Sequence, residues 1–303
     1  MRYLGHPFRT AADVEAMIDL LLVGRAAGRF DLWPTIAQLR VICTAPAAGW
    51  TVWLWVDDRE RPIAFALLDA TYGSLHWFVR PGLEADADLQ IIGWAQEQRR
   101  AANPHDPVPR CMIRAEDRAR IARVERLGLV REPHATVRLS RPLAEPIPAP
   151  RLPAGFTIRP VAGEQEVAAY VALHREAMGT SGMTIDHRLA IMRDPAYMPD
   201  LDLVAVAPDG TLAAYCFCSI NAEENARSGR AEGWTDPLGT RPGFQRQGLA
   251  RALLLEGMGR LRAQGGATAI AGTGSWNVAA RRAFASVGYR EIFHIVRYCW
   301  RAP

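Results

Sequence analysis

The segment QRQGLA, residues 245–250, joins a predicted strand to a predicted helix. Upstream, residues 231–237 have the pattern of a strand, and downstream the apolar residues recur at helical spacing: Leu249, Leu253, Leu254, Met258 and Leu261. The N-terminus of a helix carries unpaired backbone N–H groups and the positive end of the helix dipole, so it can hold a phosphate anion. Gly248 and Ala250 keep side chains away from the backbone there. The segment therefore predicts a phosphate-binding loop.

This loop and its surroundings resemble the GNAT family of acyl-CoA N-acyltransferases, whose signature is Gln/Arg-x-x-Gly-x-Gly/Ala. The segment TRP at residues 240–242 lies where the family has Val-x-Pro. Further on, the family's Asn-x-x-Ala-x-x-x-Tyr-x-x-x-Gly-Phe pattern is matched, with Phe in the Tyr place, by Asn277, Ala280, Phe284, Gly288 and Tyr289. The resemblance covers about residues 155–300. It implies an α/β (α+β) fold in which a mixed, mostly antiparallel sheet is flanked by helices.

The two halves of the chain look like repeats. Residues 79–81 (VRP) and 240–242 (TRP) are 161 positions apart, and Gly128 and Gly288 are 160 apart. Hairpin patterns precede both Arg-Pro pairs. We therefore predict two GNAT-like domains, with a degenerate one at residues 1–140, a proline-rich linker at 141–153, and an acetyl-CoA-binding one at 154–303. The organisation is similar to that of mycothiol synthase-like two-domain acetyltransferases.

The second half has a predicted order of elements that matches the GNAT fold. Strands are expected at residues 156–159, 201–207, 212–220, 231–237, 268–273 and 291–300, and helices at 164–178, 185–192, 248–264 and 277–287. In the first half, the helix that follows Arg80 begins instead with Glu84, Asp86 and Asp88. Acids there stabilise a helix but repel a pyrophosphate. The first half is therefore expected to have lost coenzyme A binding.

Composition narrows the class of protein. The chain has 303 residues, of which 49% are hydrophobic and 22% charged, which is typical of globular domains. The five cysteines form no zinc or disulfide pattern, and Cys216 and Cys218 are expected in the core. The net charge of +4 comes from scattered arginines, so nucleic acid is not indicated. We expect no metal, no membrane partner, a cytoplasmic location and a monomer or homodimer.

The resemblance implies that acetyl-CoA is held by two stretches of backbone. The loop and helix start supply Gln245, Arg246, Gln247, Gly248, Leu249, Ala250 and Arg251, and the preceding strand supplies Leu238, Gly239 and Thr240. Asn277 matches a family residue that contacts the cofactor. A helix N-cap is the structural alternative for Asn277.

Acetyl transfer to an amine needs a carboxylate that takes a proton. Glu232, Trp234 and Asp236 alternate onto one face of the predicted strand. Relatives place an acid where this chain has Trp234, so a bulge would have to bring a neighbouring acid into position. We favour Asp236 over Glu232 as the base, while solvated charges with no role remain an alternative. Trp234 then becomes a wall of the substrate pocket.

The residue expected to protonate the leaving thiolate is the clearest departure from the family pattern. The usual acid is a Tyr, and Phe284 stands in its place without a proton to donate. Trp276 could line the acceptor channel or simply pack, and we group it with Trp234 and Phe284 around the substrate. The sequence predicts an acetyl-CoA-dependent N-acetyltransferase that acts on a small-molecule primary amine by direct transfer in a ternary complex. The alternatives are a non-catalytic acyl-CoA-binding or regulatory protein, and a protein or peptide N-acetyltransferase.

Overall fold

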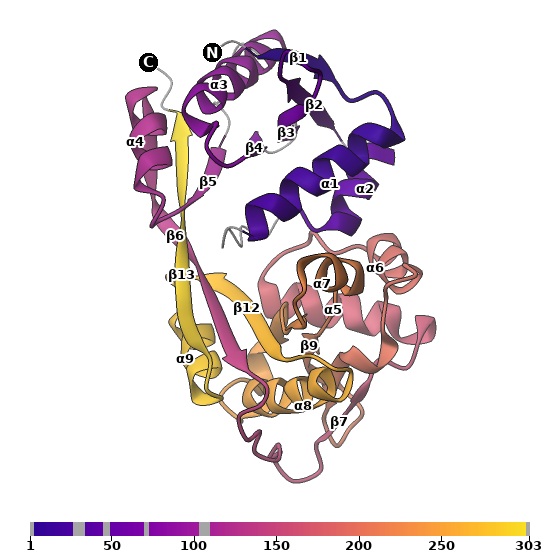
Figure 1. Ribbon diagram of the computed structural model, residues 1–303. Coiled ribbons are helices and arrows are strands. Elements are labelled where there is room, and N and C mark those ends of the chain that lie inside the picture. The colour runs from indigo at the N-terminus through magenta and orange to yellow at the C-terminus, as the bar shows by residue number, and fades with distance from the viewer. Residues whose placement is uncertain (1–2, 27–33, 45–48, 70–72, 103–109, 301–303) are drawn as a thin grey trace. The chain divides into compact units, whose positions relative to one another are not determined.

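The computed structural model describes residues 3–26, 34–44, 49–69, 73–102 and 110–300, and it divides into two compact units (Figure 1). Unit 1 comprises residues 1–136 and 293–303, and unit 2 comprises residues 137–292. The division differs from one drawn by sequence order, because the last strand of the chain belongs mainly to unit 1. Its residues Ile295–Tyr298 pair antiparallel with Arg114–Cys111, so contacts with unit 1 fix that end of the chain.

Unit 1 is a sheet with helices on both faces. Its described elements, in chain order, are β1 (Leu4–Pro7), α1 (Ala11–Ala26), α2 (Ile36–Thr44), β2 (Trp50–Val56), β3 (Pro62–Asp69), β4 (Ser74–Val79), α3 (Glu84–Ala102), β5 (Arg110–Arg114), α4 (Arg118–Arg126) and the first part of β6 (Leu129–Pro142). The strand order is β1-β2-β3-β4-β5, with β13 (Arg290–Trp300) next to β5.

Side chains that point to alternate faces of the strands in unit 1 form two hydrophobic clusters. Leu54 and Phe65 pack with Met17 and Ile18 of α1 on one face. On the other face, the neighbouring residues Trp55 and Ala64 pack with Ile91 of α3 and Val124 of α4. A period of two along a strand sends successive side chains to opposite faces, so the sheet is covered by α1 and α2 on one side and by α3 and α4 on the other.

Unit 2 repeats this layered plan. Its elements are the end of β6, β7 (Thr157–Pro160), the short 3-10 helix η2 (Glu164–Glu166), α5 (Val167–Met178), α6 (Ile185–Met192), η3 (Pro199–Leu201), β8 (Asp202–Val206), β9 (Leu212–Phe217), α7 (Ala222–Ser228), β10 (Glu232–Trp234), β11 (Leu238–Thr240), η4 (Pro242–Phe244), α8 (Leu249–Ala263), β12 (Thr268–Gly274), α9 (Val278–Ser286) and the start of β13. Strands β11-β9-β8-β7 form one sheet, while β6, β12 and β10 are neighbours in the other.

Helices cover both faces of the strands in unit 2. Leu253, Leu254 and Met258 of α8 pack with Phe284 of α9 and with alternate residues of β8 and β9. On the opposite face, Tyr170 and Leu173 of α5 pack with Val204 and Tyr215. The predicted α/β (α+β) fold, with a mixed and mostly antiparallel sheet flanked by helices in each half, is confirmed.

Several details differ from the sequence-based prediction. The strand expected at residues 212–220 ends at Phe217, and helix α7 was not predicted. The strand expected at residues 231–237 ends at Trp234, and a second short strand, β11, begins at Leu238. The proline-rich segment is extended, but it is packed rather than free: Leu143 is buried, and Ile147 and Leu152 lie against the core of unit 2. Its first two residues complete β6.

In the described parts of the chain, no helix combines the length and the apolar character needed to cross a membrane. The same residues contain no group of three or more His, Cys, Asp or Glu side chains placed to hold a metal ion. Cys216 and Cys218 are buried in the core of unit 2, as expected.

Candidate functional site

The loop before α8 turns sharply so that the helix starts without a side-chain cap. Arg246 and Gly248 both have left-handed backbone, with φ of 64° and 85°. In the described structure, the Cβ of a residue at position 248 would meet no atom within 4 Å, so glycine is needed there for its backbone freedom. Gly248 is the N-cap residue, and its Cα hydrogen offers the backbone N–H groups no acceptor. The loop therefore delivers an open helix N-terminus.

The backbone N–H groups of residues 246–251 have no hydrogen-bond acceptor among the described residues; the next N–H, that of Ala252, bonds to Gly248 O at 3.0 Å. The first turn of α8 also contains no acidic side chain. Helix α8 is fixed below this turn by Leu249 and Leu253, which are 1% and 0% exposed. This run of oriented donors at the positive end of a helix fits the pyrophosphate of coenzyme A.

Strand β11 offers a second set of backbone groups. It pairs antiparallel with β9, so Gly239 lies opposite Tyr215, and it is the edge strand of its sheet. Pro237 O accepts from Phe217 N–H, and Arg241 N–H donates to Ala213 O, both toward β9. Because the direction alternates along a strand, the backbone groups of Leu238 and Thr240 face away from β9. An extended pantetheine arm could pair with this edge.

Asp236 lies where two strands part. Strand β10 runs parallel to β12 as far as Thr235, whose N–H donates to Ile270 O at 3.0 Å; after that point β11 pairs with β9 instead. Asp236 Oδ2 accepts a hydrogen bond from Gly272 N–H of β12 at 3.2 Å. The carboxylate thus bridges the two strands at the residue where they separate.

The environment of Asp236 raises the pKa of its carboxyl group toward neutral pH. Burial raises its pKa from 3.8 to about 6, while the positive charge of Arg138 and the Gly272 N–H pull the pKa in the opposite direction. Its second oxygen, Oδ1, is buried with no hydrogen-bond partner among the described residues. A carboxylate with one oxygen anchored and the other unpartnered is suited to accept a proton from a bound group.

Glu232 has a different environment. Its carboxylate lies 3.7 Å from the guanidinium of Arg230, and its backbone N–H and C=O are bonded by the side chain of Asn225 in α7. Trp234, two residues on, carries the guanidinium of Arg138 at 4.7 Å from its ring centroid. The two candidate acids therefore lie in different surroundings: Glu232 lies beside Arg230, and Asp236 lies where β10 and β12 separate.

Asn277 is the N-cap of α9. Its side chain accepts a hydrogen bond from Ala280 N–H at 3.0 Å, which confirms the capping alternative. Only the carboxamide oxygen is used in this bond, and among the described residues the amide nitrogen has no acceptor, so it can donate to a ligand. Trp276, directly before it, is 53% exposed. A large exposed aromatic residue beside a helix start is available to a ligand as well as to solvent.

Phe284 lies in the hydrophobic core. It is 2% exposed and its ring meets that of Tyr289 edge-on, with centroids 5.2 Å apart. The Tyr289 hydroxyl is bonded to Thr235 Oγ1 at 2.7 Å, and burial raises its pKa well above 10. Ser286 donates to Ala283 O at 2.7 Å. These hydroxyl groups close to Phe284 are already engaged in internal hydrogen bonds.

Several residues of the site were not predicted from the sequence. They are Arg138, Gly272 and the Thr235–Tyr289 pair. Arg138 is far in sequence from the loop at residues 245–250, and it is part of no sequence motif. His174, which no sequence pattern singled out, is bonded through Nδ1 to the Tyr215 hydroxyl at 2.8 Å.

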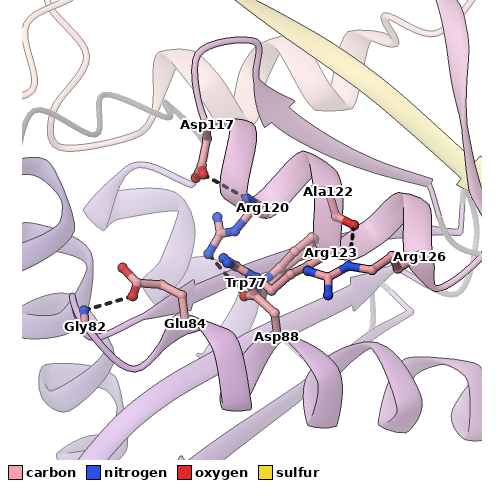
Figure 2. Close-up of polar contacts among 9 residues, drawn as sticks. All are labelled: Trp77, Gly82, Glu84, Asp88, Asp117, Arg120, Ala122, Arg123 and Arg126. Atoms are coloured by element: carbon pink, nitrogen blue, oxygen red, sulfur yellow. Dashed lines mark hydrogen bonds and ion pairs between the residues drawn. The ribbon is translucent and has the colours of Figure 1, made fainter.

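The corresponding helix start in unit 1 is occupied by the chain's own carboxylates (Figure 2). Glu84 accepts a hydrogen bond from Gly82 N–H at 2.8 Å, in front of α3. Asp88, one turn into α3, is fully buried and accepts from Trp77 Nε1 at 2.6 Å. Negative side chains thus take the place that an anion would need.

Two arginines of α4 complete this cluster in unit 1. Arg123 and Arg120 approach the Asp88 carboxylate at 2.7 Å and 3.4 Å. Helix α4 is capped by Asp117, which accepts from Arg120 N–H, just as Asn277 caps α9. The caps are 160 residues apart, which matches the repeat spacing. In unit 1, side chains therefore connect α3 and α4.

Comparison with known proteins agrees with the fold. Residues 161–289 match the model of the acetyltransferase (GNAT) family. A mycothiol acetyltransferase of Frankia casuarinae is 29% identical over 177 residues, which are 55% of this chain and 51% of that protein. One from Kineococcus radiotolerans is 36% identical over 113 residues, 36% of this chain and 34% of that protein. The chain spans about half the length, or less, of these curated relatives.

Solved structures share the fold over nearly the whole chain. A GCN5-related N-acetyltransferase from Sphaerobacter thermophilus has a TM-score of 0.78 at 20% identity, over 98% of this chain and 95% of that one. A tandem GNAT protein from the clavulanic acid biosynthesis pathway has a TM-score of 0.78 at 16% identity, over 98% of both chains. Residues 161–289 of the chain therefore match the GNAT acetyltransferase family, and the whole chain has the same fold as a tandem, two-domain GNAT protein. The family uses an acyl-CoA donor.

Proposed function

We propose that the protein is an acetyl-CoA-dependent N-acetyltransferase that acts on a small-molecule primary amine by direct transfer in a ternary complex. The observation that carries the proposal is the run of backbone N–H groups at residues 246–251 without acceptors in the described structure. The names of the sequence relatives, mycothiol acetyltransferases, support acetyl as the acyl group and a small molecule as the acceptor.

Residues of unit 2 would hold the donor. The N–H groups of Arg246–Arg251 bind the pyrophosphate, with Gln245 bonded to Thr240 O at 3.3 Å so that it closes the loop. The outward backbone groups of Leu238 and Thr240 orient the pantetheine arm, and the Asn277 amide contacts it. When bound, acetyl-CoA supplies an acetyl group activated as a thioester.

Asp236 would take the proton from the acceptor amine. Its pKa of about 6 leaves most of it ionised at neutral pH. A base needs a pKa near the working pH, so that it is both ionised and basic enough to accept a proton. The unpartnered Oδ1 is the atom that would receive this proton. Glu232, already beside Arg230, is the less suitable base.

The leaving thiol would depart without a protein acid. Phe284 cannot donate, and the nearby hydroxyls of Tyr289 and Ser286 are bonded elsewhere. A thiol has a pKa of about 8.5, so its thiolate is a tolerable leaving group near neutral pH. Proton transfer to the departing sulfur then falls to solvent, and a slower reaction than with a tyrosine is expected.

Phe284 and the carboxylates at α3 also favour a second candidate, a non-catalytic acyl-CoA-binding protein. An assay of thiol release from acetyl-CoA across a panel of small primary amines separates the two. Amine-dependent release that is lost in Asp236→Asn supports the enzyme. Tight acetyl-CoA binding with no amine-dependent release, for any amine or for a peptide N-terminus, supports the binding protein.

A further inference from the structure

Arg138 reaches across a neighbouring strand toward the proposed base. It belongs to β6, whose neighbour in the sheet is β12, and β12 in turn pairs with β10. Despite this position two strands away, its guanidinium lies over the ring of Trp234, with 4.7 Å between the guanidinium carbon and the ring centroid. Arg138 is 8% exposed. A buried guanidinium thus stands beside the strand that leads into Asp236.

Gly272 of β12 makes this crossing possible. A Cβ built on Gly272 would lie 2.6 Å from an Nη atom of Arg138 and 3.2 Å from its guanidinium carbon. The same Cβ would lie 3.5 Å from Asp236 Oδ2, and the Gly272 N–H donates to that oxygen. The guanidinium, the glycine backbone and the carboxylate are therefore packed at one point. Any side chain at position 272 would displace the arginine.

Titratable groups from three parts of the chain interact with Asp236. Arg138 approaches from β6 and favours the ionised carboxylate. Cys216 of β9 and Tyr289, just after α9, are the other titratable groups that interact with it. The hydrogen bond with Cys218, together with burial, raises the pKa of Cys216, and burial raises the pKa of Tyr289. Both pKa values lie far above the range in which Asp236 titrates, so both groups remain neutral there. Arg138 is thus the fixed charge that opposes the burial of Asp236.

We propose that Arg138 is a positioning residue, which reaches over Gly272 to keep the buried Asp236 ionised and aimed at the acceptor amine. This deepens the proposed function and rests on it. The geometry also explains why a large aromatic residue fits at position 234: its ring supports the guanidinium on one face. That face of Trp234 is then not left for a cationic substrate.

The test titrates the Asp236 carboxyl directly in the full chain. The protein is labelled with ¹³C at aspartate Cγ, and the signal that disappears in Asp236→Asn identifies Asp236. Arg138→Met removes the charge and keeps the apolar stem, while Arg138→Lys keeps the charge. Gly272→Ala keeps the arginine but pushes it away. Arg290→Met is the matched control, because Arg290 is 77% exposed and contacts Glu145.

We expect a midpoint near 6 in the wild type. Arg138→Met and Gly272→Ala should raise it by about one pH unit or more, as loss of a nearby opposite charge does. Arg138→Lys should retain most of the wild-type behaviour, and Arg290→Met should match the wild type. The acid limb of the kcat profile should move by the same amount, with an unchanged KM for acetyl-CoA.

An unchanged midpoint in both Arg138→Met and Gly272→Ala would overturn the proposal. If Arg138→Met does not fold, Gly272→Ala and Arg138→Lys decide the question. Failure of the proposed function would look different. In that case the carboxyl midpoint would still move, but no amine-dependent rate would follow it, which would remove Asp236 and Arg138 from the reaction without removing their coupling.

Discussion

Asp236 and Gly272 are joined by a hydrogen bond from a backbone N–H to a carboxylate across the point where two strands separate. The bond fixes one carboxylate oxygen and leaves the other buried without a partner in the described structure. Gly272 is on β12 and Asp236 follows β10, so both strands of the junction hold the carboxylate. The proposed base is therefore held at the junction of the two strands.

Asp236→Asn should lower turnover by about 100-fold or more, which is typical for the loss of a general base. Binding of acetyl-CoA should be nearly unchanged, because Asp236 precedes the loop that offers the backbone donors. Glu232→Gln is the matched control and should have a smaller effect, since Glu232 lies beside Arg230. Steady-state kinetics of thiol release measure both. Equal turnover in Asp236→Asn and wild type across the pH range would rule out this base.

Stability should depend on pH through Asp236. Its folded-state pKa is about 6, above the ordinary 3.8, so the folded protein favours the protonated form. Its contribution to stability is therefore fully present below about pH 4 and is lost as the pH rises through 6. Relative to Asp236→Asn, the wild type should lose about 3 kcal/mol of unfolding free energy over that range. Urea unfolding of both proteins at a series of pH values measures this loss. If the free energies of unfolding of wild type and Asp236→Asn change in parallel with pH, the prediction is wrong.

Phe284→Tyr should keep or raise turnover, because it restores a donor where family members have tyrosine. The ring is buried against Tyr289, so the added oxygen should lower stability by about 1–3 kcal/mol. Thermal unfolding and the thiol-release rate test the two parts separately. A folded variant that binds acetyl-CoA yet turns over far more slowly would show that the leaving group is accommodated in another way.

Asp88→Ala should strongly destabilise unit 1. Asp88 is fully buried beside Arg120 and Arg123, and its removal leaves two largely buried positive charges without their partner. We expect a loss of about 3–5 kcal/mol. Glu15→Ala is the control, because the exposed Glu15–Arg40 pair should contribute less than about 1 kcal/mol. Calorimetric melting compares them, and equal melting temperatures would show that the cluster has no structural role.

The sequence predicted the parts of the fold that depend on local patterns. Helix α6 has its predicted bounds, and α8 begins directly after the loop glycine, Gly248. Both helices could be predicted because apolar spacing and the backbone freedom of glycine are signals that lie within the segment itself. The Asn277 cap was also anticipated, since an N-cap depends on its neighbours in the chain.

The remaining features depend on contacts between distant segments. Arg138 meets Trp234 only because β6, β12 and β10 are neighbours in one sheet, and no pattern near residue 138 indicates it. The break between Trp234 and Leu238 arises because β10 and β11 pair with different strands. Likewise, the three acids of α3 were predicted to exclude phosphate, but the binding of Asp88 by two arginines of α4 was not.

Calorimetric titration of the full chain with acetyl-CoA tests the central claim most directly. We predict one molecule bound per chain, no binding to Gly248→Glu, and retained binding to Gly210→Glu. The two glycines are matched, with φ of 85° and 86° and no atom near an added Cβ, so backbone strain is similar in both variants. Only Gly248→Glu places a carboxylate at the start of α8. Two molecules bound per chain, or undiminished binding by folded Gly248→Glu, would contradict the account.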